Sequence, residues 1–291
     1  LDFSIIDHRN FLEPLKNNIW GGGAGTAWST VMAYSTEAYP NPEDAPKSWG
    51  DFFDADFPGR RGIKDWYHAN LVFALLGDNP DLLKTAEGRA SLSAPTDAQI
   101  DRAFEVLTAF KPDIDVFWSG GSDCPQMLLS GELDMCSAWN GRIYDAQQEG
   151  SPLAICWECG YLLSSDANVI PKGLKDQDPN QFELAQLVLG WMSLPEISVE
   201  VSKYISYGPV NLDAVPLLNG PGFESVKGQL PTSPENIDFA ILEHEGWTGE
   251  NQDAWSERFQ AFLQGGSTEP TLRDRSEWTA DEPATLRELE A

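Results

Sequence analysis

Basic residues are scarce in this sequence. Lys and Arg number 19 against 46 Asp and Glu, so the formal net charge of the 291-residue chain is −27. A surface this acidic does not hold nucleic acid phosphates without local basic patches, and the sequence contains none. We therefore expect no nucleic acid partner. The acidity suits either solubility or the attraction of cationic solutes, and composition does not separate the two.

Histidine and cysteine are also few. The three histidines are scattered, and there are four cysteines. Cys156 and Cys159 have the CxxC spacing, but a zinc site needs a second CxxC and a redox motif needs a helix start. We expect no bound metal. Cys124, Cys136, Cys156 and Cys159 are either buried thiols or, in an exported protein, structural disulfides whose pairing the sequence leaves open.

Long apolar runs and catalytic constellations are missing as well. No stretch of 18 apolar residues occurs, so the sequence predicts no transmembrane helix, and no signal peptide is visible at Leu1. The glycines of 21–25 lack the GK[ST] ending of a phosphate-binding loop. No nucleophile stands beside a base, so we expect no catalytic residue and no cofactor. A hydrolase that uses two of the 46 acidic residues is not excluded by spacing alone.

Strand-like and helix-like segments alternate along the chain. Thr96 and Gln99 form a capping-box pattern in front of an amphipathic helix that runs to Phe110. Strands are predicted in the apolar run that follows the glycines up to residue 34 and at 114–118, 133–139, 153–157 and 167–170. Helices are predicted at 48–53, 66–76, 96–110, 125–130, 142–148, 182–193, 195–201 and 254–263. This alternation predicts an α/β fold with a mainly parallel or mixed sheet flanked by helices.

Three side chains stand at the predicted ends of strands. Trp139 ends a strand, Arg142 starts the next helix, and Asp166 precedes the last strand of that region. Small ligands bind at such ends in open α/β sheets. An indole face attracts an ammonium group, a carboxylate pairs with one, and a guanidinium grips a carboxylate through two parallel hydrogen bonds. The alternatives are a core tryptophan, a turn aspartate, and an internal salt bridge from Arg142 to Asp145 or Glu149.

Short segments in a fixed order resemble those of a known family. They are 46–54 (PKSWGDFFD) with 57–61 (FPGRR), 101–104 (DRAF), 129–132 (LSGE), 139–142 (WNGR), 170–173 (IPKG) and 207–211 (YGPVN). In this order they resemble the polyamine-type periplasmic solute-binding proteins of ABC importers, with the spermidine/putrescine branch the nearest. The resemblance covers the chain from about residue 20 to residue 263.

The resemblance implies a two-lobed, type II periplasmic-binding-protein-like fold with the ligand between the lobes. Residues 1–26 and 164–212 would form a partial lobe one, 27–163 and 213–264 lobe two, and 265–291 an acidic polar tail. The family's N-terminal segment is not found before residue 19, so we expect lobe one to be incomplete. The resemblance further implies a periplasmic protein, its signal peptide not in this sequence, that delivers a small cationic or zwitterionic solute to ABC permease subunits in the inner membrane.

The resemblance also narrows the solute. Asp166 matches the aspartate that holds an amine in polyamine binders. That branch clamps a second amine with further acidic residues, but only Asp65 is acidic in the corresponding stretch 63–69, where Trp66 offers an aromatic face instead. A polyamine also has no anion for Arg142.

An ω-amino acid such as 4-aminobutyrate is therefore as good a candidate as putrescine or spermidine. Tyr207 is a further cleft residue, or alternatively a structural residue of the hinge. A ligand-sensing module that acts through a protein partner stays an alternative to transport.

Overall fold

Strand β1 (Thr26–Ser35) connects the sheet by pairing with four other strands. The computed structural model describes residues 25–266 and residue 268. The first half of β1 pairs with β6 on one edge and β7 on the other, and the second half pairs with β5 and β4. The sheet is mixed and has the order β3-β2-β4-β1-β6-β8, with β5 and β7 also on β1. The other strands are β2 (Arg61–Lys64), β3 (Val116–Trp118), β4 (Met135–Trp139), β5 (Leu153–Cys156), β6 (Tyr161–Ser165), β7 (Gly208–Pro209) and β8 (Ala240–Leu242).

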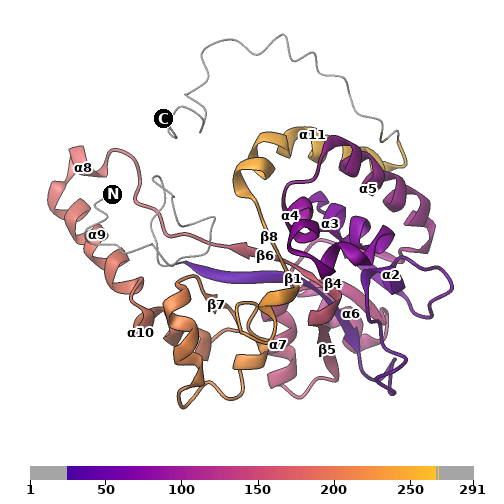
Figure 1. The fold of residues 1–291 in the computed structure, drawn as a ribbon, viewed down its shortest axis with the longest axis horizontal. Helices are drawn as coiled ribbons and strands as arrows, with labels where there is room; N and C mark the ends of the chain where they lie inside the picture. The colour runs from indigo at the N-terminus through magenta and orange to yellow at the C-terminus, as the bar shows by residue number, and fades with distance from the viewer. Residues whose placement is uncertain (1–24, 267, 269–291) are drawn as a thin grey trace, which may run out of the picture.

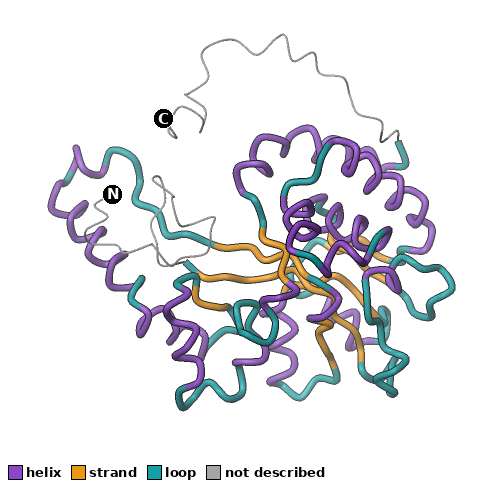
Figure 2. The backbone as a smooth tube through the Cα atoms, in the orientation of Figure 1, coloured by secondary structure: helices purple, strands orange, loops and turns teal. Residues whose placement is uncertain are grey.

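Helices cover the sheet on both sides (Figures 1 and 2). The α-helices are α2 (Trp49–Phe52), α3 (Tyr67–Asp78), α4 (Ala86–Ser93), α5 (Asp97–Phe110), α6 (Asp123–Ser130), α7 (Asn140–Gln148), α8 (Leu174–Gln177), α9 (Pro179–Met192), α10 (Pro195–Ser198) and α11 (Glu245–Gln264). Short 3-10 helices are η1 (Pro80–Lys84), η2 (Lys111–Asp113), η3 (Trp157–Cys159), η4 (Val199–Lys203), η5 (Leu212–Asn219), η6 (Lys227–Gln229) and η7 (Ile237–Phe239).

The side chains of β1 alternate between two hydrophobic cores. Met32 belongs to the core that packs α2, α3, α5 and α11. Val31 and Ala33 point to the other core, which includes residues of α6 and α7. Because successive residues of a strand face opposite sides of a sheet, an apolar run such as β1 is buried on both faces. The two-sided burial explains why Val31, Met32 and Ala33 are apolar at successive positions of the strand.

Strands β2, β3 and β4 run parallel to one another. Lys64 is in register with Trp118 across β2 and β3, and Gly62 is in register with Cys136 across β2 and β4. All three strands end at the same edge of the sheet, where α3, α6 and α7 begin shortly afterwards. This edge is the place where an open α/β sheet offers a ligand-binding crevice.

Most predicted elements are confirmed within one to three residues, including the capping box of α5. The strand predicted at 167–170 is wrong. The chain leaves the sheet after Asp166, whose N–H donates to the Thr26 carbonyl (2.9 Å), and the residues beyond it form no strand. Strand β6 lies just before this segment and pairs with β1 and with β8. The sequence prediction missed it, and it also missed β2, β7 and β8.

Helix α9 carries the predicted apolar face, but that face is exposed in the described structure. Leu184, Leu187, Val188 and Trp191 are 45–60% exposed. By contrast, Trp255, Phe259 and Phe262 of α11 are buried as their spacing predicts. The predicted polar tail at 265–291 lies almost entirely outside the described residues, and the division of the chain into lobes stays a prediction.

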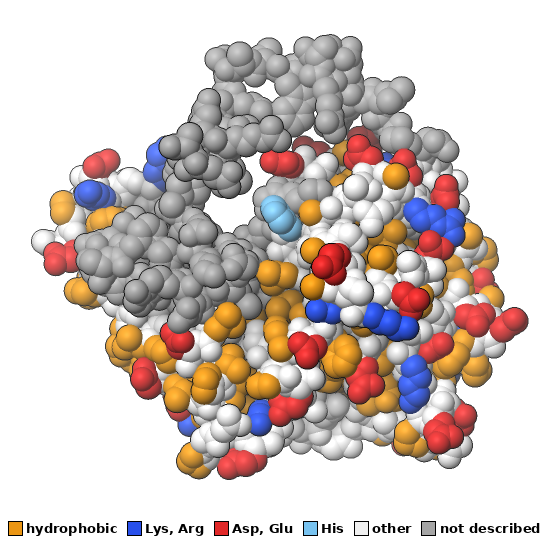
Figure 3. Space-filling view, in the orientation of Figure 1, with side chains coloured by type: hydrophobic (Ala, Val, Ile, Leu, Met, Phe, Trp, Pro, Cys, Tyr) orange, Lys and Arg blue, Asp and Glu red, His pale blue; other side chains and the backbone are white. Residues whose placement is uncertain are grey.

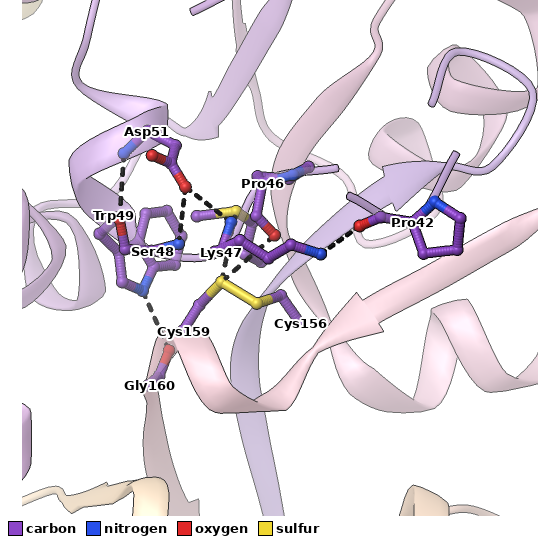
Figure 4. Close-up of a disulfide and its surroundings, with 10 residues drawn as sticks. Pro42, Pro46, Lys47, Ser48, Trp49, Asp51, Cys156, Cys159 and Gly160 are labelled. Carbon is purple, nitrogen blue, oxygen red and sulfur yellow. Dashed lines mark hydrogen bonds between the residues drawn. A yellow bond between two sulfur atoms is a disulfide. The ribbon is translucent and has the colours of Figure 1, made fainter. Parts of the chain in front are cut away.

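The four cysteines form two disulfides in sequence order. Cys124–Cys136 joins α6 to β4, and Cys156–Cys159 closes the turn at η3 (Figure 4). Beside that turn the Trp49 indole N–H donates to the Gly160 carbonyl (2.9 Å). The CxxC pair is thus part of a structural turn between β5 and β6.

Asn140 joins β1 to the segment that precedes β7. Its side-chain oxygen accepts from the Ser29 N–H (2.9 Å), and its amide nitrogen donates to the Ser206 carbonyl (2.6 Å). All three residues are fully buried. Strands β7 and β4 pair with the same edge of β1 and leave a gap between them. The side chain of Asn140 bridges this gap.

The substitution Asn140→Ala should lower the free energy of unfolding by about 2–4 kcal/mol, because it leaves a buried N–H and a buried C=O without partners. Chemical denaturation measures this loss. Asn41→Ala is the matched control, since its amide bonds Asp44 on the exposed surface (2.9 Å) and its loss should cost no more than about 0.5 kcal/mol. Equal losses in the two variants would contradict the role given to Asn140.

His68 is a source of pH-dependent stability. Its Nε2 lies 3.5 Å from the Glu243 carboxylate at the end of β8 and 3.4 Å from the Thr248 hydroxyl of α11. Burial lowers the pKa of His68 below its ordinary value, and the Glu243 charge only partly opposes this shift. The folded state therefore favours the neutral imidazole.

A depressed histidine pKa means that the unfolded chain binds the proton first as the pH falls. The stabilisation is complete above the unfolded pKa of about 6.5 and is lost as the pH drops through and below that value. We expect the melting temperature to fall between pH 7.5 and 5.5, and to fall less in His68→Gln. Identical slopes for the two proteins in a thermal melt would show that His68 does not carry the effect.

Candidate ligand-binding site

Three side chains meet where the parallel strands end. Lys64 ends β2, Trp118 ends β3 and Trp139 ends β4. The Lys64 Nζ lies 4.8 Å from the centre of the Trp118 ring and 5.3 Å from that of Trp139, and the two indoles meet edge to face at 6.1 Å. An ammonium over an indole face is attracted to the electron-rich ring. The protein therefore places a cation of its own on the two indoles of this edge.

The Lys64 ammonium is held in place by the loop after β3. Its Nζ donates to the Ser119 carbonyl (2.8 Å) and lies 3.6 Å from Asp65 Oδ1. The other oxygen of Asp65 accepts a short hydrogen bond from the Ser119 hydroxyl. Only 20% of the Lys64 side chain is exposed, against 35% for Asp65. The pair forms a partly buried, mutually neutralising unit at the end of β2.

Trp139 is partly exposed and packs against Trp28 and Gly121. Its ring meets Trp28 of β1 edge to face at 6.1 Å. A Cβ on Gly121 would lie 2.5 Å from Trp139 Cζ3 and 3.6 Å from Arg142 Nε. The absence of a side chain at Gly121 thus makes space for the Trp139 indole, and the Arg142 guanidinium borders the same space.

Arg142 lies in the first turn of α7 and is exposed. Within residues 25–266 its guanidinium forms no ion pair, so the internal salt bridges to Asp145 and Glu149 that the sequence allows are absent there. A cation at a helix N-terminus is repelled by the helix dipole. An anion from outside the described residues would relieve this repulsion.

Asp166 lies across β1 from Trp139, whereas Tyr207 lies on the same edge of β1 as β4. Asp166 follows β6, next to the start of β1, and its carboxylate is exposed. Tyr207 precedes β7, and its ring lies against the start of α7, because a Cβ on Gly141 would come within 2.7 Å of Tyr207 Cε1. The Tyr207 carbonyl accepts from the Ser202 hydroxyl (2.8 Å), which fixes the backbone there.

Tyr207 feels the charges of two of the other predicted residues, Arg142 and Asp166. Burial raises the pKa of Tyr207 above its ordinary value. The positive charge of Arg142 lowers it, and the negative charges of Asp166 and Asp145 raise it. Arg142 and Asp166 are 24 positions apart in sequence, yet their opposite charges shift the pKa of the same Tyr207 phenol in opposite directions.

Trp66 is less closely tied to this group. It follows Asp65, is 45% exposed, and stacks on Tyr67 with ring centres 5.2 Å apart. Sequence reasoning missed Lys64, Trp118 and Trp28 as neighbours of the site. The available signal was the apolar strand that ends at Trp118, whereas the strand that ends at Lys64 (RGIK) has only one large apolar residue.

Comparison with known proteins identifies the family of the chain. Residues 10–226 match the profile of the bacterial extracellular solute-binding proteins. The chain belongs to this family. It is 35% identical over 243 residues to the gamma-aminobutyric acid-binding protein of Pseudomonas aeruginosa, covering 83% of this chain and 63% of that one. It is 25% identical over 226 residues to the spermidine/putrescine-binding periplasmic protein of Escherichia coli, covering 75% and 58%. The family member described here thus spans less than two thirds of the length of these relatives.

Solved structures agree with the family assignment. An ABC transporter substrate-binding protein from Bradyrhizobium japonicum is 32% identical, with a TM-score of 0.75 over 91% of this chain and 76% of that one. A GABA receptor structure is 26% identical, with a TM-score of 0.70 over 90% and 74%. These neighbours and the helix-flanked mixed sheet confirm the predicted α/β fold of type II periplasmic binding proteins.

Metal sites and membrane-spanning helices were also sought among the described residues. No group of three or more His, Cys, Asp or Glu side chains in that part of the chain is arranged to hold a metal ion. No helix there has the length and apolar character needed to cross a membrane.

Proposed function

We propose that this chain is the solute-capturing component of an ABC importer and that it binds a small zwitterionic amine such as 4-aminobutyrate. The observation that carries the proposal is that an exposed guanidinium, Arg142, and an exposed carboxylate, Asp166, both act on the Tyr207 phenol through their charges. A guanidinium and a carboxylate on one site match the two charged ends of an ω-amino acid. The family membership supports solute capture, and the gamma-aminobutyric acid-binding relative supports this solute class.

Each end of the ligand has a partner of suitable chemistry. Arg142 is exposed and forms no ion pair with another residue of 25–266, and a guanidinium can grip a ligand carboxylate in two parallel hydrogen bonds. Asp166 presents a carboxylate to the ammonium end. The Tyr207 phenol, whose ring lies against Gly141 at the start of α7, can donate a hydrogen bond to the ligand. The Trp139 indole supplies an apolar wall for the methylene chain.

A polyamine fits this arrangement less well. Its ammonium groups have no use for Arg142, which would repel them. The stretch 63–69 offers only Asp65 as a further carboxylate, and Lys64 already neutralises it at 3.6 Å. Both features favour a ligand with one ammonium and one carboxylate.

The role we propose needs no covalent chemistry. Two lobes close over the solute, the removal of water strengthens the charged contacts, and the closed form is presented to a membrane permease from the periplasmic side. In this proposal β1 and β6 cross between the lobes, with 27–163 and 213–264 in lobe two and 164–212 in lobe one. Asp166 and Tyr207 would then belong to lobe one and Arg142 to lobe two, so that ligand binding draws the lobes together.

Calorimetric titration at pH 7.5 tests the proposal with ligands that separate the two ends. We expect 4-aminobutyrate to bind, and butylamine and butyrate, which each keep one charged end, to bind at least about 30-fold more weakly. Asp166→Asn and Arg142→Gln should each weaken 4-aminobutyrate binding by about 30-fold or more, since each leaves one ligand charge unpaired in the cleft. Lys172→Gln, which removes an exposed cation of the surface, should leave the affinity unchanged.

The outcomes separate the parts of the proposal. Unchanged affinity in both Asp166→Asn and Arg142→Gln would remove the site. Tighter binding of spermidine than of 4-aminobutyrate, with Arg142→Gln harmless, would keep amine capture and reject the zwitterion. A protein that binds none of these ligands would contradict amine capture itself.

A further inference from the structure

The Lys64–Asp65 pair lies where a second ammonium group of a ligand would find its partners. This corner offers two indoles, those of Trp118 and Trp139, and the Asp65 carboxylate, while the nearby Asp123 carboxylate already accepts from the Ser119 and Gly120 N–H groups. Aromatic faces and a carboxylate are the groups that bind an ammonium ion. The Lys64 ammonium occupies all three contacts at once.

Local bonds hold Lys64 in this position. The Ser119 carbonyl accepts from Nζ (2.8 Å), and the 20% exposure of the side chain leaves little water around the ammonium. Asp65 is fixed in turn, because its N–H donates to the Trp118 carbonyl (2.9 Å) and its carboxylate accepts from the Ser119 hydroxyl. A ligand ammonium would have to displace Lys64 or lie beside it.

This corner is connected to the proposed binding residues through Trp139. The Lys64 ammonium lies over the Trp139 ring, and the space above Gly121 brings that same ring next to the Arg142 guanidinium. A ligand whose ammonium pairs with Asp166 and whose far end reaches Trp139 therefore meets Lys64 and Arg142 there. Two cations at that end attract a carboxylate and repel an ammonium.

We propose that Lys64 is a specificity-determining residue that excludes diamines and polyamines from this site. It does so by occupying the two indoles and neutralising Asp65, and it favours ligands whose far end is a carboxylate. This inference rests on the proposed function, because it assigns a selecting role within the same site. Removal of the Lys64 charge should uncover a binding place for a second ammonium.

The test compares putrescine with 4-aminobutyrate by calorimetric titration of the wild-type chain and of Lys64→Met. Methionine keeps the length of the stem and removes the charge. We expect putrescine affinity to rise by about tenfold or more in Lys64→Met, while 4-aminobutyrate affinity stays equal or falls. Adding Asp65→Asn to Lys64→Met should cancel the gain for putrescine.

Two further variants make the result specific to this position. Lys84→Met makes the same change of net charge at an exposed lysine that pairs with Asp81, and it should leave the putrescine affinity unchanged. Lys64→Gln keeps a donor for the Ser119 carbonyl, and it replaces Lys64→Met if the latter does not fold, as judged by its melting curve. It should show the same gain.

Unchanged putrescine affinity in a folded Lys64 variant that still binds 4-aminobutyrate would overturn the inference and leave the proposed function standing. Equal affinities of the wild-type chain for putrescine and 4-aminobutyrate would also overturn it. Failure of the wild-type chain to bind either ligand would instead contradict the proposed function.

Discussion

The pairing of β1 with strands on both of its edges is the constraint on which the rest of the structure depends. Ten residues hold β4 and β5 at one end and β6 and β7 at the other. Because side chains alternate along the strand, Met32 and its neighbours Val31 and Ala33 anchor separate cores on the two faces. Asn140 fills the gap between β7 and β4 with two buried hydrogen bonds. The residues on either side of Asn140 are therefore held firmly.

This framework explains why the site lies where it does. Trp139, Asn140 and Arg142 follow one another at the junction of β4 and α7, and Asp166 follows the strand on the opposite edge of β1. A ligand that contacts both groups lies across β1. The chemistry of the site thus follows from the ends of strands rather than from any single motif.

The charge of the whole molecule contrasts with the charges of the site. Acidic side chains are spread over the face seen in Figure 3, in keeping with a net charge of −27, whereas basic ones are few. Two of the 19 basic residues of the chain, Lys64 and Arg142, lie at or just after the carboxyl ends of β2 and β4. Bulk acidity alone would favour polycations, but the two local cations act at much shorter distance and are less screened by salt. Placed charges, not net charge, therefore determine the ligand class in this account.

Local patterns predicted the elements that depend on local physics. The capping box of Thr96, the strand that ends at Trp139 and the helix that carries Arg142 are read from neighbouring residues. Strand β6 was misplaced because two serines follow its short apolar run Tyr161–Leu163, and its pairing with β1 and β8 is not visible in the sequence. The contact of Lys64 with Trp118 depends on the register of strands 54 residues apart, and the disulfide pairing depends on tertiary distance. Such long-range contacts could not be derived from spacing.

A crystal structure of the protein with 4-aminobutyrate tests the central claim most directly. The account predicts the ligand carboxylate within hydrogen-bonding distance of the Arg142 guanidinium, the ammonium on the Asp166 carboxylate, and Lys64 still over the Trp118 and Trp139 rings. A ligand bound away from the ends of β4 and β6, or one whose ammonium has replaced Lys64 on the indoles, would contradict it.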